Sequence, residues 1–253
     1  MSTCLLGLFV VIILHLNLTD CVKEIDDRII GGVEVPIDEF PYQLSLSYEE
    51  HFICGAVLIS RKYALTAAHC IRLPGMYTVR AGSPNFDRGG TVIPIKKAML
   101  HPWRRKANDD YDLAILEFRF KVRFSDIIKP VRLPKQDEPV PDGIKGTASG
   151  WGSMSAIVTV LSDNLRAITV PVMPKPICRR DYWGIDISDR QFCAGYMNGG
   201  RDTCNGDSGG PFVIDDKLYG IVSWGFQCAR PGSPGVYTSI PALRDYIRIN
   251  TGV

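Results

Sequence analysis

Residues 206–211 read Gly-Asp-Ser-Gly-Gly-Pro, a serine set in a glycine-rich loop. Glycine has no Cβ, so such a loop can adopt backbone angles that other residues avoid and can aim several amide N–H groups at one small space. N–H groups arranged in this way can stabilise the oxyanion that forms when a serine attacks an acyl carbon. The same residue types also build ordinary turns. The stretch therefore nominates Ser208 as a nucleophile, provided that partner residues occur elsewhere in the chain.

Two further stretches supply a base and an acid. Residues 65–70 read Leu-Thr-Ala-Ala-His-Cys, and residues 110–116 read Asp-Tyr-Asp-Leu-Ala-Ile-Leu. In the second stretch, Asp112 immediately precedes an apolar run that is typical of a strand entering a core. Taken singly, His69 would fit an ordinary core or surface histidine, and Asp112 a solvated acid. Together with Ser208 they give a histidine, an aspartate and a serine in that chain order.

These three stretches and their order resemble the chymotrypsin-like serine proteases, in particular the trypsin type, over residues 29–253. The resemblance implies an all-β fold of two antiparallel β-barrels with a C-terminal helix, and a catalytic site in the cleft between the barrels. It implies that Ser208 is the nucleophile and His69 the general base and acid, while Asp112 orients His69 and stabilises its cation. It also implies an oxyanion hole formed by the backbone N–H groups of Gly206 and Ser208.

The remaining sequence pattern agrees with an all-β chain. Short runs rich in Val, Ile, Tyr and Thr are separated by Gly and Pro, which favours a barrel or a sandwich. The strands expected from this pattern span residues 42–47, 56–59, 77–81, 113–118, 165–170, 212–214 and 218–224. One helix is expected, beginning near Pro241, because apolar residues recur after it at helical spacing. The Pro-, Asp- and Lys-rich stretch 130–146 is expected to connect the two halves.

The N-terminus indicates a secreted protein. Residues 5–18 are nearly all apolar, which is too short to span a bilayer but suits the apolar part of a signal peptide. We expect a signal peptide over residues 1–21, with cleavage after Thr19 as an alternative; a signal anchor or a buried helix would also fit. The mature protein is then expected outside the cell and free of the membrane. A net charge of +2 over 253 residues gives no argument for nucleic acid as a partner.

Six cysteines remain once residues 1–21 are removed: Cys54, Cys70, Cys178, Cys193, Cys204 and Cys228. An even number in a secreted chain favours disulfides, although six cysteines allow 15 pairings. The alternative is a metal site, which the lack of paired Cys-x-x-Cys stretches disfavours. The family resemblance implies the pairs Cys54–Cys70, Cys178–Cys193 and Cys204–Cys228. No cofactor and no metal are expected; calcium in particular is disfavoured because few carboxylates follow Gly82.

Residues 28–32, Arg-Ile-Ile-Gly-Gly, match the activation site of the family. Cleavage after Arg28 would free the Ile29 ammonium group, which the resemblance pairs with Asp207 beside the nucleophile. Removing one partner of a buried ion pair costs about 3–5 kcal/mol, so the uncut chain is expected to be nearly inactive. Residues 22–28 then form an activation propeptide, and residues 29–253 form the protease domain.

The resemblance also nominates residues that select the substrate. Asp202 would form the floor of the primary specificity pocket, where a carboxylate favours a substrate Arg or Lys because a desolvated cation needs a partner. Gly225 and Gly235 match pocket walls that are free of side chains. The other expected substrate-binding residues are Ser223 and Trp224, on the strand that pairs with the substrate backbone, and Tyr182, below the pocket. A chymotrypsin-like or elastase-like preference is the alternative, which Asp202 opposes.

Two residues depart from the family pattern near this site. Gln227 stands at the rim of the pocket, where glycine is usual, and is expected to narrow access for large inhibitors. Asp109 stands where an apolar residue commonly shapes the next subsite. As an exposed acid, it is expected to disfavour substrates with an acidic residue before the cleaved Arg or Lys.

The sequence thus predicts a secreted serine endopeptidase, made as a zymogen, that cleaves after Arg or Lys. Its expected partners are polypeptide substrates and protein protease inhibitors, and it is expected to be a monomer. The alternative is a catalytically weak protease homologue that acts as an extracellular binding or regulatory protein. The presence of His69, Asp112 and Ser208 together favours the enzyme.

Overall fold

The computed structural model describes residues 31–72 and 74–253. The predicted signal peptide and propeptide, together with Arg28 and Ile29, lie outside these residues. The described chain consists mainly of β-strands: β1 (Val33–Glu34), β2 (Gln43–Tyr48), β3 (His51–Leu58), β4 (Tyr63–Thr66), β5 (Tyr77–Ala81), β6 (Thr91–Leu100), β7 (Ala114–Phe118), β8 (Lys145–Gly150), β9 (Arg166–Pro171), β10 (Gln191–Ala194), β11 (Pro211–Ile214), β12 (Lys217–Trp224) and β13 (Gly235–Ser239). Among the described residues no helix has the length and apolar character that crossing a membrane requires.

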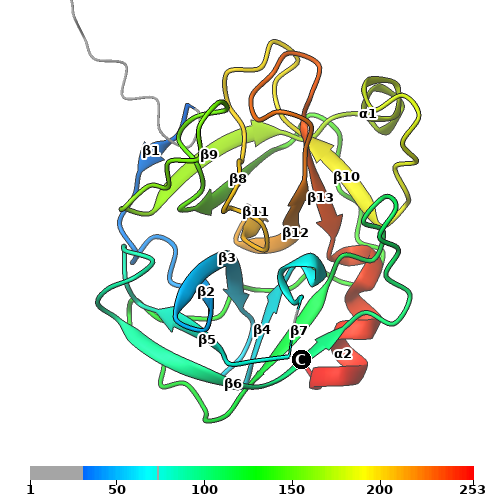
Figure 1. Ribbon diagram of the computed structural model, residues 1–253. Helices are drawn as coiled ribbons and strands as arrows, with labels where there is room; N and C mark the ends of the chain where they lie inside the picture. The colour runs from blue at the N-terminus through cyan, green and yellow to red at the C-terminus, as the bar shows by residue number, and fades with distance from the viewer. Residues whose placement is uncertain (1–30, 73) are drawn as a thin grey trace, which may run out of the picture.

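Strands β2 to β7 form a closed antiparallel barrel in the order β2-β3-β4-β7-β6-β5 (Figure 1). Successive side chains of a strand point to opposite faces of the sheet, so every second one faces the barrel interior. In β5, for example, Tyr77, Val79 and Ala81 are buried, whereas the residues between them are partly exposed. The barrel interior is filled by aliphatic side chains such as those of Leu44 and Ile115, which have no exposed surface.

The remaining strands form a seven-stranded sheet in the order β1-β9-β8-β11-β12-β13-β10. The sheet curls so that its β10 edge meets the end of β9 through an isolated bridge between Val172 and Ala194. Aromatic rings fill its interior: Phe192 lies 5.4 Å from Phe212 and from Tyr237, measured between ring centroids. The expected all-β fold of two antiparallel barrel-like halves with a C-terminal helix is confirmed.

Two α-helices and two short 3-10 turns complete the fold of the residues that the structure describes. The C-terminal helix α2 (Arg244–Thr251) follows the 3-10 turn η2 (Pro241–Leu243) and packs the side chain of Ile247 into the core of the first barrel. The expected C-terminal helix is confirmed, and helix α1 (Lys175–Asp181) is an element that the sequence pattern did not indicate. Prolines stand at positions 174 and 176. Both lie at the start of α1, where a missing N–H costs nothing.

The two halves meet along a seam formed by β3 and the segment that precedes β11. There the backbone N–H of Gly55 donates a 2.8 Å hydrogen bond to the carbonyl oxygen of Ser208. The backbones approach so closely that a Cβ at position 55 would lie 2.9 Å from the Cα of Gly210, which only glycine permits. Beside this contact, the Ser149 hydroxyl donates to the Gln43 side chain at 2.7 Å. The seam therefore fixes the position of the Ser208 loop on the first barrel.

Candidate active site

His69 and Asp112 are joined in the first barrel. His69 lies in the 3-10 turn η1 (Ala68–Cys70) after β4, and Asp112 lies just before β7, which pairs with β4. The backbone N–H of His69 donates to Oδ1 of Asp112, and Nδ1 of His69 lies 2.8 Å from Oδ2. Because a carboxylate can only accept hydrogen bonds, Nδ1 carries the proton and Nε2 is left free to accept one.

Asp112 is completely buried, with 0 % of its side chain exposed. Burial alone would raise its pKa, but hydrogen bonds from His69 and Ser223 outweigh that cost and hold the pKa of Asp112 below its ordinary value. The Ser223 hydroxyl donates to Oδ2 at 2.6 Å, and the Thr238 hydroxyl donates to the main-chain carbonyl at 3.0 Å. Both donors belong to the second sheet, so Asp112 is held in place from both halves of the molecule.

Ser208 lies at the seam, in the turn that precedes β11. The carbonyl of Ser208 accepts from Gly55, and the Cys70 sulfur, next to His69 in the chain, lies 3.9 Å from the same oxygen. Gly209 has a φ of +80°, and a Cβ there would lie 2.2 Å from Oγ1 of Thr66, so the residue after the serine must be glycine. Among the described residues no hydrogen bond joins the Ser208 hydroxyl to His69. Catalytic hydrogen bonds are often long before substrate binds.

Asp207 is fully buried beside Ser208. Its carboxylate accepts hydrogen bonds from the backbone N–H groups of Gly152 at 2.8 Å and Cys204 at 2.9 Å. Burial raises the pKa of Asp207 to about 6, although the two hydrogen bonds act against that rise. The predicted partner Ile29 lies outside the described residues.

Gly206, before Asp207, has a φ of +101°. The N–H groups of Gly206 and Ser208 donate to no protein acceptor among the described residues.

A cavity of about 60 Å³ runs from Ser208 to Asp202. Asp202 is 3 % exposed; its Oδ2 accepts from the Ala229 N–H at 3.0 Å, whereas its Oδ1 is buried without a hydrogen-bond partner among the described residues. Burial raises the pKa of Asp202 to about 7, and the Ala229 hydrogen bond acts in the opposite direction. A free carboxylate oxygen at the end of a narrow cavity provides a place for one positive group.

Four of the other five predicted substrate-binding residues lie along this cavity. Gly225, Gly235, Ser223 and Trp224 line it. A Cβ at Gly235 would lie 2.9 Å from Oδ1 of Asp202, and a side chain at Gly225 would meet no atom closer than 3.9 Å and so would occupy open space at the cavity wall. Tyr182 packs edge-on against Trp224, with ring centroids 4.8 Å apart, and its hydroxyl donates to the carbonyl of Pro234.

The three expected disulfides, Cys54–Cys70, Cys178–Cys193 and Cys204–Cys228, are confirmed. Two of them brace the site, because Cys70 follows His69 and Cys204 donates its N–H to Asp207. Cys54, Cys70 and His69 have potential metal-ligand atoms within 4.8 Å of one another. The first bridge uses both of these sulfurs, so they do not form a thiolate metal site.

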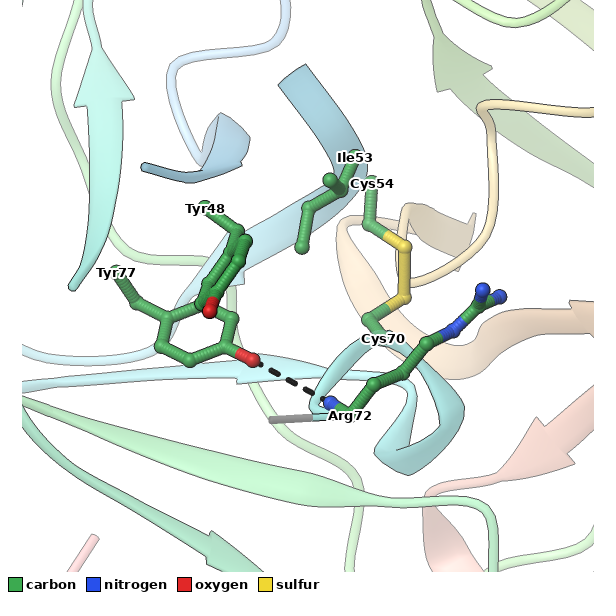
Figure 2. Close-up of a pocket in the computed structure, with 6 residues that line it drawn as sticks. All are labelled: Tyr48, Ile53, Cys54, Cys70, Arg72 and Tyr77. Atoms are coloured by element: carbon green, nitrogen blue, oxygen red, sulfur yellow. Dashed lines mark hydrogen bonds between the residues drawn. A yellow bond between two sulfur atoms is a disulfide. The ribbon is translucent and has the colours of Figure 1, made fainter. Parts of the chain in front are cut away.

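A second cavity, of about 210 Å³, lies beside the Cys54–Cys70 bridge. Figure 2 shows the disulfide and Arg72 at one side of this cavity and the rings of Tyr48 and Tyr77 at the other. The Nε atom of Arg72 donates to the carbonyl of His69 at 3.2 Å. The cavity is therefore a mostly apolar hollow with one cation, Arg72, at its edge, and its lining residue Cys70 follows His69 in the chain.

Sequence reasoning assigned Ser223 to the strand beside the substrate but did not anticipate the hydrogen bond between its hydroxyl and Asp112. It also did not single out Arg104, whose Nη2 donates to Oδ1 of Asp109 at 3.0 Å and whose Nε lies 3.5 Å from Oδ1 of Asp112. Asp109 was expected as a free acid, but it is paired. The basic run Arg-Arg-Lys at 104–106, next to the acids at 109, 110 and 112, was the available signal.

Comparison with known proteins agrees with this geometry. The sequence model of the family described as Trypsin matches residues 29–247. The chain is 42 % identical to Trypsin 5G1 of Aedes aegypti, over 89 % of this chain and 86 % of that protein. It is 38 % identical to the vitellin-degrading protease of Bombyx mori, over 94 % and 91 %, and 35 % identical to Trypsin-2 of Salmo salar, over 88 % and 94 %. With a buried Asp–His pair, a serine loop docked beside it and this similarity along the chain, the protein belongs to the trypsin family of serine endopeptidases.

Proposed function

We propose that this endopeptidase cleaves peptide bonds after Arg or Lys, and that it is secreted as a zymogen. The observation that carries the specificity is the Oδ1 atom of Asp202, which is buried and unpartnered at the end of the cavity that begins at Ser208. A lysine ammonium or an arginine guanidinium group would supply the missing donor. An apolar side chain would leave the carboxylate unsatisfied, which costs several kcal/mol for a buried charge, about 3–5.

The proposed reaction begins when the Ser208 hydroxyl attacks the scissile carbonyl carbon while Nε2 of His69 takes the hydroxyl proton. The positive imidazolium is stabilised by the Asp112 carboxylate at Nδ1. The N–H groups of Gly206 and Ser208 donate to the oxyanion. The C–N bond then breaks, the leaving amine takes the proton from His69, and an acyl-enzyme remains on Ser208. Water, deprotonated by His69, attacks the ester, and the proton returns to Ser208 as the acid product leaves.

Activation is proposed to act through Asp207. Its carboxylate is fully buried and accepts hydrogen bonds from two backbone N–H groups. Burial raises its pKa, and among the described residues no cationic side chain pairs with it. A new ammonium group at Ile29, released by cleavage after Arg28, would neutralise it. Because Asp207 lies between Gly206 and Ser208, a rearrangement of the backbone at Asp207 would move both proposed oxyanion donors.

Secretion is supported by the apolar N-terminal segment and by the three disulfides, which form in oxidising compartments. Polypeptides are the substrates of this family. We further propose that the protease acts as a monomer and is inhibited by protein protease inhibitors. Such inhibitors would present an Arg or Lys to Asp202.

The decisive experiment compares hydrolysis of matched peptide substrates that differ only in the residue before the cleaved bond: Arg, Lys, Phe or Ala. After limited proteolysis of the purified chain, Arg and Lys substrates should exceed Phe by several orders of magnitude in kcat/KM. Asp202→Ser should abolish that preference, while a serine-directed organophosphonate still labels Ser208. A wild-type preference for Phe or Ala would refute the proposed specificity without touching the family assignment.

A further inference from the structure

We propose that Arg104 is a positioning residue of the catalytic pair: its guanidinium group bridges Asp109 and Asp112, and so shares the charge of Asp112 that would otherwise act on His69 alone. The inference rests on the proposed roles of His69 and Asp112. It concerns how strongly the acid acts on the base, which those roles leave open.

The bridge is built from adjacent nitrogens of one guanidinium group. Nη2 of Arg104 donates to Oδ1 of Asp109 at 3.0 Å, and Nε lies 3.5 Å from Oδ1 of Asp112. The Arg104 side chain is 16 % exposed, and Asp112 is 0 % exposed. The planar fork of arginine suits two acceptors at once, whereas a lysine offers a single point of charge. The contact is therefore shielded from solvent at its Asp112 end, where charge interactions are strongest.

The Nε atom has no other use. It is buried and makes no hydrogen bond to any described residue. A buried N–H that lacks a hydrogen-bond partner is costly. Here its distance of 3.5 Å from Oδ1 of Asp112 places the cation against the anion. Among the described residues, Arg104 and His69 are the two basic side chains within 4.0 Å of the Asp112 carboxylate.

The loop that carries these groups is held in a constrained shape. Asp109 and Tyr111 have φ values of +45° and +54°, in the left-handed region that residues other than glycine seldom adopt. The Arg105 N–H donates to the Asp110 carbonyl at 3.0 Å, which closes the loop and places Arg104 opposite Asp109. The Gln191 side chain, from the second half, donates to the carbonyl of Asp109 at 3.3 Å. Loop shape thus brings an acid to each side of the Arg104 fork.

The electrostatic consequence has a definite sign. Asp112 favours the protonated form of His69, because an opposite charge stabilises the imidazolium. A permanent cation on the far oxygen of Asp112 weakens that preference. Without the cation, His69 would hold its proton to higher pH, so the acidic limb of kcat/KM, which reports the free base, would move to higher pH. Without the competing acid Asp109, the cation would act on Asp112 more fully, and the limb would move to lower pH.

Other charged groups face this site and must be held constant. Arg72 donates to the His69 carbonyl from the η1 side. On the loop before β7, Asp110 is paired with Arg190 of the second half. His101 stacks on Tyr111, with ring centroids 4.5 Å apart, and burial lowers its pKa. None of these groups is changed in the variants below, so their contributions cancel in the comparison with wild type.

The test uses the full chain after limited proteolysis, with active sites counted by an organophosphonate. Arg104→Gln should raise the acidic limb of kcat/KM by roughly half a pH unit or more, a conservative figure for loss of a neighbouring charge. Arg104→Lys should restore most of the wild-type limb, and Asp109→Asn should shift it in the opposite direction. Arg105→Gln removes the adjacent, exposed charge and should leave the limb where it is. The pH dependence of organophosphonate labelling should show the same shifts without any substrate.

Three outcomes would overturn the inference. The acidic limb of kcat/KM could lie at the same pH in wild type and Arg104→Gln, or it could shift in Arg105→Gln by as much as in Arg104→Gln. It could also shift in the same direction in Arg104→Gln and Asp109→Asn. If Arg104→Gln does not fold, Arg104→Lys and Asp109→Asn still decide, since an unmoved limb in Asp109→Asn contradicts the shared charge. Failure of the proposed function looks different. In that case the wild-type chain itself shows no labelling at Ser208 and no activity to compare.

Discussion

The hydroxyl of Ser223, on β12, donates a 2.6 Å hydrogen bond to Oδ2 of Asp112, the same oxygen that faces Nδ1 of His69. The second sheet therefore orients the acid of the first barrel directly. A hydrogen bond to a charged group contributes about 1.5–3 kcal/mol. The Ser223 side chain thus holds the carboxylate that faces His69.

Replacing Ser223 by Ala should lower kcat by roughly tenfold with little change in KM, because Asp112 would hold His69 less firmly and 1.4 kcal/mol of orientation is worth about that factor. Steady-state kinetics on active-site-titrated enzyme measures it. Ser45→Ala is the matched control: Ser45 is also buried, donates at 2.8 Å to the Phe86 carbonyl and lies away from Asp112. Equal losses of kcat in both variants would show that general loosening is responsible.

Cleavage after Arg28 should raise activity by orders of magnitude, and Asp207→Asn should abolish that rise even in the cut chain. The reason is the buried Asp207 carboxylate, which an ammonium at Ile29 would neutralise. Activity and organophosphonate labelling before and after limited proteolysis give the result. Arg28→Gln serves as the uncut control, and full activity in that chain would contradict the zymogen mechanism.

Ser208→Ala and His69→Ala should each reduce kcat by on the order of 10⁴-fold or more, and the double variant should lose little beyond either single one, because the residues act as a unit. Active-site titration must show that the residual rate does not come from contaminating wild-type enzyme. Additive losses would mean that His69 and Ser208 act separately and would contradict the assignment.

A monocationic ligand such as benzamidine should bind more tightly as the pH rises through about 7. Burial raises the pKa of Asp202 to about 7, so below that value the carboxyl is largely protonated and must release its proton to pair with the cation. Affinity should therefore fall by up to about tenfold for each pH unit below 7. Calorimetry in buffers of different ionisation enthalpy measures the released proton.

The controls for that measurement separate Asp202 from His69. His69→Ala should retain the pH dependence, whereas Asp202→Asn should lose both the affinity and its dependence on pH. The neutral analogue benzamide should bind weakly at every pH. If His69→Ala loses the pH dependence of binding, that dependence arises from His69 and not from Asp202.

Unfolding should become easier as the pH falls below the ordinary carboxyl range, partly through Asp110. The pKa of Asp110 lies below its ordinary value. Burial acts to raise this pKa, but the ion pair between Nη2 of Arg190 and Oδ2 of Asp110, at 2.6 Å, and the hydrogen bond from the Ser188 hydroxyl outweigh that effect. A lowered pKa in the folded state gives stability that is present above the unfolded pKa and lost as pH falls through the folded one. Asp110→Asn should cost about 2 kcal/mol at pH 7, less than a fully buried pair because Arg190 is 29 % exposed.

Urea unfolding of variants made in the Ser208→Ala background, which prevents self-digestion, measures this cost. The gap between Asp110→Asn and its parent should close as the pH approaches 3. Asp189→Asn is the control: Asp189 pairs with Lys175 at 2.5 Å but is 81 % exposed, so its loss should cost little. A gap for Asp110→Asn that persists at low pH would point to packing.

Much of the site could be predicted because its chemistry lies in short, contiguous stretches. The residues around His69, Asp112 and Ser208 are adjacent in sequence to their partners in the motif, and the resemblance supplied the disulfide pairs. Contacts between distant segments carry no such signature. The Ser223 hydroxyl reaches Asp112 across 111 positions, and Arg104 reaches the same carboxylate through a loop whose left-handed residues no simple pattern indicates.

Two of the strands that the sequence pattern did not indicate, β8 and β6, lack a clear local signal for a strand. Strand β8 reads Lys-Gly-Thr-Ala-Ser-Gly, with few side chains of high β-propensity. It forms because its neighbours need small residues: a Cβ at Gly146 would lie 2.2 Å from the ring of Phe212. Strand β6 contains Pro94 and two lysines at 96 and 97, which interrupt the alternation expected of a strand. In both strands, tertiary packing overrides local preference.

The seam between the two halves affects how this enzyme loses activity. Hydrogen bonds from Gly55 to Ser208 and from Ser223 to Asp112 cross it in opposite directions, so neither half contains a working set of groups by itself. A small displacement of one half against the other would abolish catalytic activity, although each half would keep its own core and its strands. Heat or a cut in the connecting chain should then extinguish activity well before the β-structure melts, which makes activity the more sensitive gauge of how the halves are docked.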